Sequence, residues 1–317
     1  MIPIQINNSF AEEHYENVKE LLVHHIKRVL KKGSVKYKTK TYNVSVNLRA
    51  ILIRLRDLNN NSLKELITKS PFELNNFVSN QDAINSTFII IGDSDNIVLR
   101  NIFIHNGYEN EKAINKWEFI NKISIDTCPY CNRNYIYTTS KNKKTKPEID
   151  HFYPKSKYPI LGLSYFNLIP SCKPCNGFGA KEERDPIIEG LSNPYLLNYN
   201  DFELSHKIKN IAIINPLYGK SDIEVYFKKS IPEHLEVFNL KELYELHYDH
   251  AIELIIKRNL KYSKKYREYL SSYKGLQFSK YEIDRMILGN YSLEKEQHKR
   301  PLSKMYQDIG KELGLIK

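Results

Sequence analysis

Two Cys-x-x-Cys pairs constrain this chain more than any other feature of its sequence. They contain every cysteine of the 317 residues: Cys128, Cys131, Cys172 and Cys175. Each turn presents two thiols on one side of a loop, and two turns complete the tetrahedral four-sulfur site that structural zinc prefers. A redox pair needs a single turn, and disulfides are disfavoured in a reducing compartment. The spacing therefore predicts one structural Zn²⁺ with no open position for catalysis.

Apolar periodicity and capping residues predict helices on both sides of the cysteines. Before them, helices are expected at residues 8–32, 47–57, 61–69 and 109–123, and a strand at 86–93. After them, helices are expected at 239–261, 264–274, 279–288 and 301–314. Pro71 is expected to end the third helix, and Asn239 with Glu242 to open the long helix at 239.

The predicted fold class is mainly α with a small α+β insert. We expect a helical N-terminal region at 1–124, a zinc-stapled insert at 125–185 and a helical C-terminal region at 186–317. Residues 1–10 show neither a basic nor an apolar run, and residues 88–91, the densest apolar run, are too short to span a bilayer. The sequence therefore predicts a cytoplasmic protein with no membrane partner.

The chain is strongly basic, with a formal net charge of +11 and a pI near 9.2. Such a charge favours a polyanionic partner such as nucleic acid. However, its basic residues are 37 Lys and 11 Arg, and an AT-rich genome gives that skew without any nucleic-acid partner. The runs at 141–146 and 257–267 are open to the same two readings, a solvated surface or a surface that binds a phosphate backbone.

Four polar residues between and beside the cysteine pairs have the chemistry of a phosphodiesterase site. His151 titrates near neutral pH and is suited to deprotonate a water, whereas Asp150 and Asn176 offer the hard oxygen ligands that Mg²⁺ prefers. Neighbours on a strand point to opposite faces, so Asp150 and His151 are expected to have different tasks. Asn167, on an expected short strand at 165–170, is placed to hold the other ring nitrogen of His151 through its amide or its backbone.

Other polar residues in the chain have weaker claims to function. Lys155, Lys157 and Lys181 are candidates for contact with nucleic-acid phosphates, although the loop that carries the first two also reads as structural. His247 and His250 have a spacing that suits a metal, but an exposed helix face is the simpler interpretation.

The whole pattern resembles the HNH endonuclease motif, a ββα-metal finger with zinc knuckles: Cys-x-x-Cys, Asp-His, Asn-Leu and Cys-x-x-Cys-Asn. The resemblance covers residues 125–185 and implies that Asp150 and Asn176 bind one catalytic Mg²⁺ or Mn²⁺. It further implies that His151 is the general base and that Asn167 orients it. Asn176 stands where other members have His, which makes the site rich in oxygen and favours Mg²⁺.

A narrower resemblance extends from residue 125 to the C-terminus. The segments CPYCNRNYI, EIDHFYPKSKYPILGLSYFNLIPSC, FNLKELYELHYDH and HKRPLSKMYQDI are similar to the HNH subunits of Septu-type and retron-linked anti-phage systems, the PtuB-like proteins. This resemblance implies a nuclease effector. DNA is the expected substrate, although a one-metal finger engages a phosphodiester and does not itself distinguish DNA from RNA. The resemblance also implies a PtuA-like partner, an ATPase of the ABC or SMC type, docked on the C-terminal helices from Asn239 onward. Two alternatives stay open: an effector that cleaves RNA, such as tRNA, and a non-catalytic zinc module or adaptor that binds nucleic acid.

Overall fold

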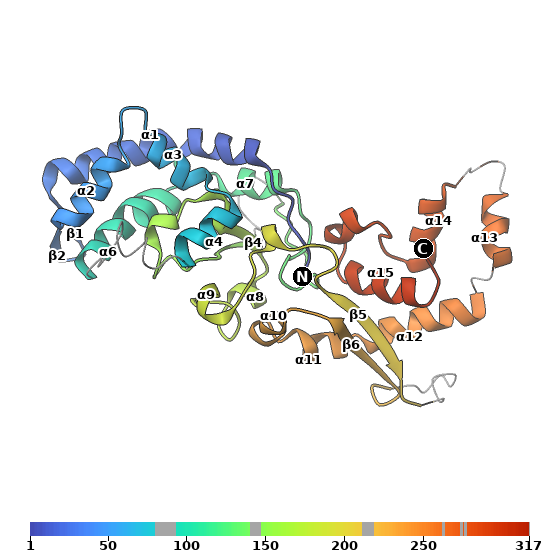
Figure 1. Cartoon of the computed structure of the whole chain (residues 1–317). Helices are drawn as coiled ribbons and strands as arrows, with labels where there is room; N and C mark the ends of the chain where they lie inside the picture. Colours follow the sequence, from blue (N-terminus) through green and yellow to red (C-terminus); the bar gives the residue numbers. More distant parts are fainter. Residues whose placement is uncertain are drawn as a thin grey trace.

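The computed structural model describes residues 1–79, 93–139, 147–210, 219–261, 264–272, 275 and 278–316. The molecule is elongated, with the N-terminal helices at one end, the C-terminal helices at the other and the predicted insert between them (Figure 1). Its secondary structure is mainly helical, with two-stranded antiparallel sheets, so the α-rich fold class is confirmed. Within the described residues, no helix combines the length and apolar character needed to cross a membrane.

The N-terminal end is built on α1 (Asn8–Lys32), which agrees with the predicted helix 8–32. The Asn7 side chain caps its start by accepting from Phe10 N, and Gly33 ends it with a φ of 66°, in the left-handed region that glycine favours. Helices α2 (Val46–Arg54) and α3 (Asn61–Thr68) pack on α1. Pro71 does more than end α3: it is the first residue of a further helix, α4 (Pro71–Ser79), a position where proline's missing N–H costs no hydrogen bond.

The next described segment contains elements that the sequence pattern did not predict. Helix α6 (Asp93–Leu99) continues into the π-helix η1 (Arg100–Tyr108), and α7 (Lys116–Ile123) is shorter than the predicted helix 109–123. Strands β1 (Ser34–Tyr37) and β2 (Lys40–Asn43) form a hairpin that packs on α6. Of the predicted strand at 86–93, all but residue 93 lies outside the described residues.

The centre of the molecule is a hairpin followed by a one-turn helix. Strand β3 (Glu148–His151) pairs antiparallel with β4 (Leu168–Ser171), and His151 lies opposite Leu168. Between them, residues 159–161 and 165–167 form the 3-10 turns η2 (Pro159–Leu161) and η3 (Tyr165–Asn167), so the second strand begins later than predicted. Helix α8 (Lys173–Asn176) follows β4, and α9 (Pro186–Glu189) and the turn η4 (Pro194–Leu196) come next.

The C-terminal end combines an unpredicted hairpin with helices. Strands β5 (Glu203–Ile208) and β6 (Ile223–Lys229) pair antiparallel, and α10 (Pro232–Val237) follows. The predicted long helix 239–261 is wrong as one element, because it is divided into α11 (Leu240–Glu245), α12 (Tyr248–Ile256) and the π-helix η6 (Lys257–Lys261). The remaining elements are α13 (Lys264–Ser271), α14 (Lys280–Leu288), the 3-10 helix η7 (Glu294–Lys299) and α15 (Ser303–Glu312).

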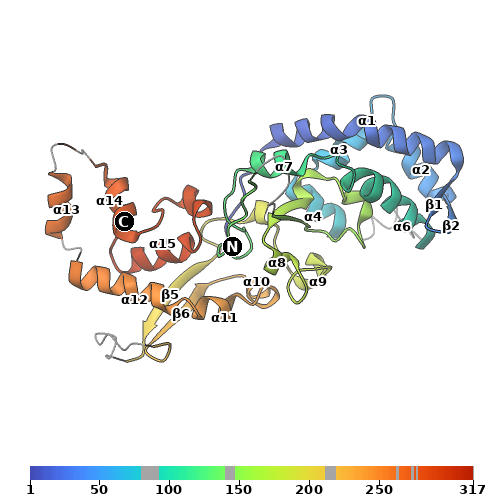
Figure 2. The ribbon, with the colours of Figure 1, turned by 180° about the vertical axis from the view of Figure 1, so that it is seen from behind.

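The buried apolar residues form one continuous cluster from Met1 and α1 through the four cysteines to α15. The segment before α1 reaches the middle of the molecule, as seen from behind in Figure 2, where Ile2 N donates to Pro129 O at 3.0 Å. Apolar packing therefore crosses both predicted boundaries, at residues 124 and 185, and the three-region division remains a prediction.

Candidate active site and metal centre

The four cysteines converge on one point, although 41 positions separate Cys131 from Cys172. All four are buried, and their sulfur atoms lie within 4.8 Å of one another. Hydrogen bonds from the neighbouring thiols, Cys128 first, hold the pKa of Cys131 well below its usual value. A cluster with such a thiolate is ready to take a cation, which would deprotonate the remaining thiols.

The surroundings of the cysteines also fit zinc. The Arg133 backbone N–H points at Cys131 Sγ (3.4 Å), and Asn134 Nδ2 points at Cys172 Sγ (3.4 Å). Such donors stabilise negative sulfur. Asn132 turns the first knuckle with a φ of 49°, and its N–H donates to Cys128 O at 2.7 Å. The donor set and its outer hydrogen bonds therefore match a closed structural Zn²⁺ site.

Asp150 faces this cysteine cluster. Its Oδ2 accepts from the hydroxyl of Tyr130, the residue between Pro129 and Cys131, at 2.6 Å. The Lys181 ammonium lies 3.4 Å from Oδ1 and 3.3 Å from Oδ2, and it also donates to His151 O at 3.1 Å. Asp150 and Lys181 are both buried, so this ion pair neutralises a carboxylate that would otherwise be costly to bury.

His151 occupies the opposite side of β3, as strand alternation predicts. Its Nε2 lies 3.1 Å from Gly162 O, and its ring meets Tyr108 edge to face at 4.4 Å. A carbonyl oxygen only accepts hydrogen bonds, so Nε2 carries the proton and Nδ1 keeps a lone pair. Burial first, and the charge of Lys155 second, lower the pKa of His151 to about 3, so the ring is neutral at physiological pH.

Asn167 does not contact the His151 ring, contrary to one of the two arrangements expected from the sequence. Its Oδ1 accepts from Tyr153 N (2.7 Å), and its Nδ2 donates to Tyr153 O (3.2 Å) and Leu161 O (2.9 Å). It thereby ties together the two ends of the loop that presents Gly162 O to His151. Any orienting effect of Asn167 on His151 therefore acts through this loop.

Asn176 lies at the end of α8 and binds a residue that the sequence interpretation missed. Its Nδ2 donates to Glu148 Oε2 at 2.8 Å, which leaves the amide oxygen for another partner. Glu148 and Asp150 are two residues apart on β3 and share a face. Alternation on the predicted strand could have indicated Glu148, because it shares the face of a candidate metal ligand. Glu148, Asp150 and Asn176 together offer the oxygen donors that Mg²⁺ or Mn²⁺ takes.

The three candidate phosphate-binding lysines have different surroundings. Lys181 is fully buried against Asp150, so a phosphate cannot reach it in this arrangement, and the expectation of direct nucleic-acid contact is corrected. Lys155 is partly exposed, 3.7 Å from Glu109, and Lys157 is exposed, 3.4 Å from Asp185. These two remain predictions.

A second group of possible metal ligands lies on α12 and the residue before it. Ligand atoms of His247, Asp249 and His250 come within 4.8 Å of one another. However, His247 Nε2 accepts from Arg133 Nε at 2.9 Å, and His250 Nδ1 is 2.6 Å from the Tyr306 hydroxyl. Each histidine already uses one ring nitrogen in these contacts, so this group is a packing contact of α12 with the first knuckle and with α15.

Comparison with known proteins gives one partial similarity. No protein-family model matches the chain, and no solved structure matches it. Among curated proteins, Septu protein PtuB of Bacillus thuringiensis is 36% identical over 73 residues. That stretch is 23% of this chain and 26% of the relative, so the chain spans about a quarter of the length of the curated relative it matches. The similarity therefore agrees, over part of the chain, with the Septu-type resemblance of the sequence.

Proposed function

We propose that this chain is a metal-dependent HNH endonuclease that hydrolyses phosphodiester bonds of nucleic acid, DNA in preference to RNA. The observation that carries the proposal is the β3–β4 hairpin followed by α8, which carries Asp150, His151 and Asn176 next to a four-cysteine cluster. Asp150 accepts from Tyr130 of the first knuckle, and His151 is a neutral imidazole whose Nε2 proton is held by Gly162 O.

His151 is the general base in the proposed reaction. Its Nδ1 lone pair takes the proton of the attacking water, while Gly162 O holds Nε2 and keeps the ring in that tautomer. The low pKa keeps the lone pair available at neutral pH, and a nearby phosphodiester anion would raise that pKa toward a stronger base.

Glu148, Asp150 and Asn176 are the residues that would hold the catalytic ion. A bound Mg²⁺ or Mn²⁺ supplies a positive charge for the scissile phosphate and the leaving oxygen. Glu148 accepts from Asn176 Nδ2, so the amide oxygen is free to act as a ligand, and a bound cation would take the place of the Lys181 ammonium beside Asp150. The four cysteines hold a separate structural zinc, which takes no part in the reaction.

The similarity to Septu protein PtuB supports a role in anti-phage defence. With the Septu-type resemblance, it supports a complex with an ATPase of the ABC or SMC type, in which the partner controls access to the site. The proposed docking region is the C-terminal end from Asn239 onward, where Leu246 and Met286 are 56% and 43% exposed.

A nicking assay tests the nuclease proposal. His151→Ala should lower the rate of Mg²⁺-dependent cleavage by at least about a hundredfold while zinc content and fold are retained, because the base acts only in the reaction. His24→Ala, at an exposed histidine of α1, is the matched control. Cleavage by His151→Ala at the wild-type rate would refute the assignment. Wild-type chain that binds nucleic acid but never cleaves it, alone or with its partner, would favour the adaptor alternative.

Docking is better tested with point variants than with truncation. Removal of residues beyond 235 would also remove Phe238, whose ring stacks on Tyr130 at 4.6 Å, and Tyr244, whose hydroxyl donates to Cys131 O at 2.8 Å. Such a truncation would damage the knuckle itself. Leu246→Glu with Met286→Glu should instead abolish co-purification with the proposed ATPase partner while zinc content stays at the wild-type level. Undiminished co-purification would place the docking surface elsewhere.

A further inference from the structure

The β1–β2 hairpin, residues 34–43, is a basic ribbon that the proposed chemistry does not use. It contains Lys36, Lys38 and Lys40 and no acidic residue. All three lysines are exposed, and none forms an ion pair within the part of the chain that the structure describes. Three uncompensated ammonium groups on a short two-stranded ribbon make a strong local positive potential.

Direct contacts join this ribbon to η1. The Tyr37 ring stacks on His105 of η1, with 5.3 Å between centroids and 13° between planes. His105 Nδ1 lies 2.8 Å from Glu109 Oε2. The ribbon is therefore fixed on the helix whose last turn carries Tyr108.

The same helix reaches the candidate base. Tyr108 meets the His151 ring at 4.4 Å, and the ammonium groups of Lys155 and Lys116 lie 5.7 and 3.9 Å from the Tyr108 ring centre. Acidic residues also lie in this region: Glu109, which Lys155 offsets at 3.7 Å, and Asp93 and Asp95 in the first turn of α6, the helix on which the ribbon packs. Lysines therefore lie at both ends of this set of contacts, on the ribbon and again beside Tyr108, whose ring meets His151.

The β5–β6 hairpin differs from β1–β2 in that some of its lysines form ion pairs. On β5–β6 and its flank, Lys209 pairs with Glu224 at 2.9 Å, and Lys228 pairs with Glu203 at 2.8 Å. Two of its lysines thus pair with carboxylates of the same hairpin, whereas none of the three lysines of β1–β2 does. Hairpin geometry alone does not explain the unpaired charge on β1–β2.

We propose that the β1–β2 ribbon binds the phosphate backbone of duplex DNA and leads it to His151. A two-stranded ribbon fits the major groove of a duplex, and unpaired lysines release counterions when they meet phosphates. The delivery to His151 rests on the proposed nuclease function, but the binding itself does not. This assigns a role to the N-terminal region, which lies outside the HNH and Septu-type resemblances.

The test compares two triple variants that remove the same charge. Lys36, Lys38 and Lys40 are replaced by Gln in one, and Lys207, Lys209 and Lys228 of the other hairpin in the control. Both carry His151→Ala, so that the probe, a short fluorescein-labelled DNA duplex, is not cut. Fluorescence anisotropy then gives the dissociation constant at several salt concentrations, and circular dichroism verifies the fold.

In the ribbon variant, the plot of log K against log salt should be less steep. The magnitude of its negative slope should fall by about 2 to 3, since each phosphate contact contributes about 0.9. The affinity of the ribbon variant near 0.1 M salt should fall about tenfold or more, while the control changes little. Equal affinity and slope in the two variants would overturn the proposal. So would loss of ATPase co-purification in the ribbon variant with DNA binding intact, which would make the ribbon a protein-docking surface. A changed slope in a chain that never cleaves DNA would support the ribbon and reject the nuclease.

Discussion

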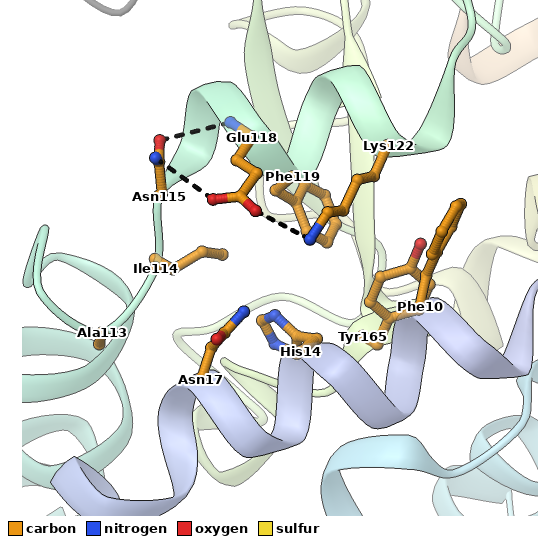
Figure 3. Close-up of a pocket in the computed structure, with 10 residues that line it drawn as sticks. All are labelled: Phe10, His14, Asn17, Ala113, Ile114, Asn115, Glu118, Phe119, Lys122 and Tyr165. Atoms are coloured by element: carbon orange, nitrogen blue, oxygen red, sulfur yellow. Dashed lines mark hydrogen bonds and ion pairs between the residues drawn. The ribbon is translucent and has the colours of Figure 1, made fainter.

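His14 offers a quantitative test of how α1 supports the candidate site. Its Nε2 lies 2.9 Å from Leu163 O, next to the Gly162 carbonyl that holds His151. Figure 3 shows the ring of His14 at the base of a small pocket between α1 and α7, near Phe119 and Tyr165. Burial, opposed by the Leu163 bond and assisted by the charge of Lys122, lowers the pKa of His14 to about 4, against 6.5 in an unfolded chain.

The depressed pKa makes stability depend on pH in a defined window. Because the unfolded chain binds the proton more tightly, His14 contributes full stability above about pH 6.5, and this is lost as the pH falls toward 4. The free energy of unfolding changes by up to about 1.4 kcal/mol per pH unit in this window. Integrated from pH 7 to pH 5, the titration of His14 lowers the free energy of unfolding by about 2 kcal/mol.

Urea unfolding at pH 7 and pH 5 measures this loss. His14→Gln keeps a donor for Leu163 O but cannot titrate. Between pH 7 and pH 5, the free energy of unfolding should therefore fall by about 2 kcal/mol more in the wild-type protein than in the variant. Other buried histidines, such as His234 with a pKa lowered to about 3 by burial, titrate in both proteins and cancel. His24→Gln, at an exposed position, is the control. Equal acid losses in wild type and His14→Gln would show that His14 is not held neutral by burial.

Four further predictions concern the metal centre, the buried ion pair, the candidate metal ligands and the loop at Gly162. Cys172→Ser should reduce zinc from about one per chain to near zero by metal analysis, and retained zinc would exclude the four-thiol site. Lys181→Met should lower the free energy of unfolding, measured with urea, by about 3–5 kcal/mol, because it leaves the buried Asp150 unpaired. Adding Asp150→Asn should restore much of this free energy, and no restoration would mean that the two side chains are not coupled. Glu148→Ala should weaken Mn²⁺ binding, measured by electron paramagnetic resonance, more than Glu148→Gln, which still accepts from Asn176; equal effects would exclude the orienting role. Gly162→Ala should cost about 1–3 kcal/mol in urea unfolding because its Cβ would lie 2.2 Å from Ile104 Cδ1; unchanged stability would show that the loop shifts freely.

Local sequence signals predicted the helices whose ends are marked by capping residues. Helix α14 begins at a complete capping box between Ser279 and Glu282, and α1 ends at Gly33, so both were found close to their observed bounds. The predicted helix 239–261 starts at Leu240 but is interrupted between Glu245 and Tyr248, and this interruption was not predictable in the same way. Asn239 adopts a φ of 49° and its side chain does not cap the helix, while Leu240 and Tyr244 are drawn into the core. Tertiary packing there overrides a pattern that reads as one helix.

The candidate site shows the same division between local and tertiary information. The convergence of the cysteines was predictable because a Cys-x-x-Cys turn fixes each pair locally. The burial of Lys181 was not, because the loop that precedes it has no periodicity and its side chain is positioned by Asp150. The Asn176 bond to Glu148 likewise depends on how α8 packs against β3, which sequence spacing does not encode.

Although Asp150 and His151 are adjacent in sequence, they are supported from opposite ends of the molecule. On the His151 side, the contacts come from the N-terminal end: Tyr108 packs on its ring, and His14 holds the turn after Gly162. On the Asp150 side, they come through the first knuckle, where Tyr130 stacks on Phe238.

Asn132 extends the second set of contacts to the C-terminal end. Its amide nitrogen donates to Gln297 O at 3.0 Å, and its amide oxygen accepts from Lys304 N, also at 3.0 Å. The knuckle is thus tied to α15 and to the turn before it. Separation of residues 125–185 from both flanks would remove the supports of the candidate base and of the candidate metal ligand together, even if the four cysteines still bound zinc. The long helical regions are therefore part of the site's construction, and any surface they offer to a partner is connected through these contacts to the residues of the proposed chemistry.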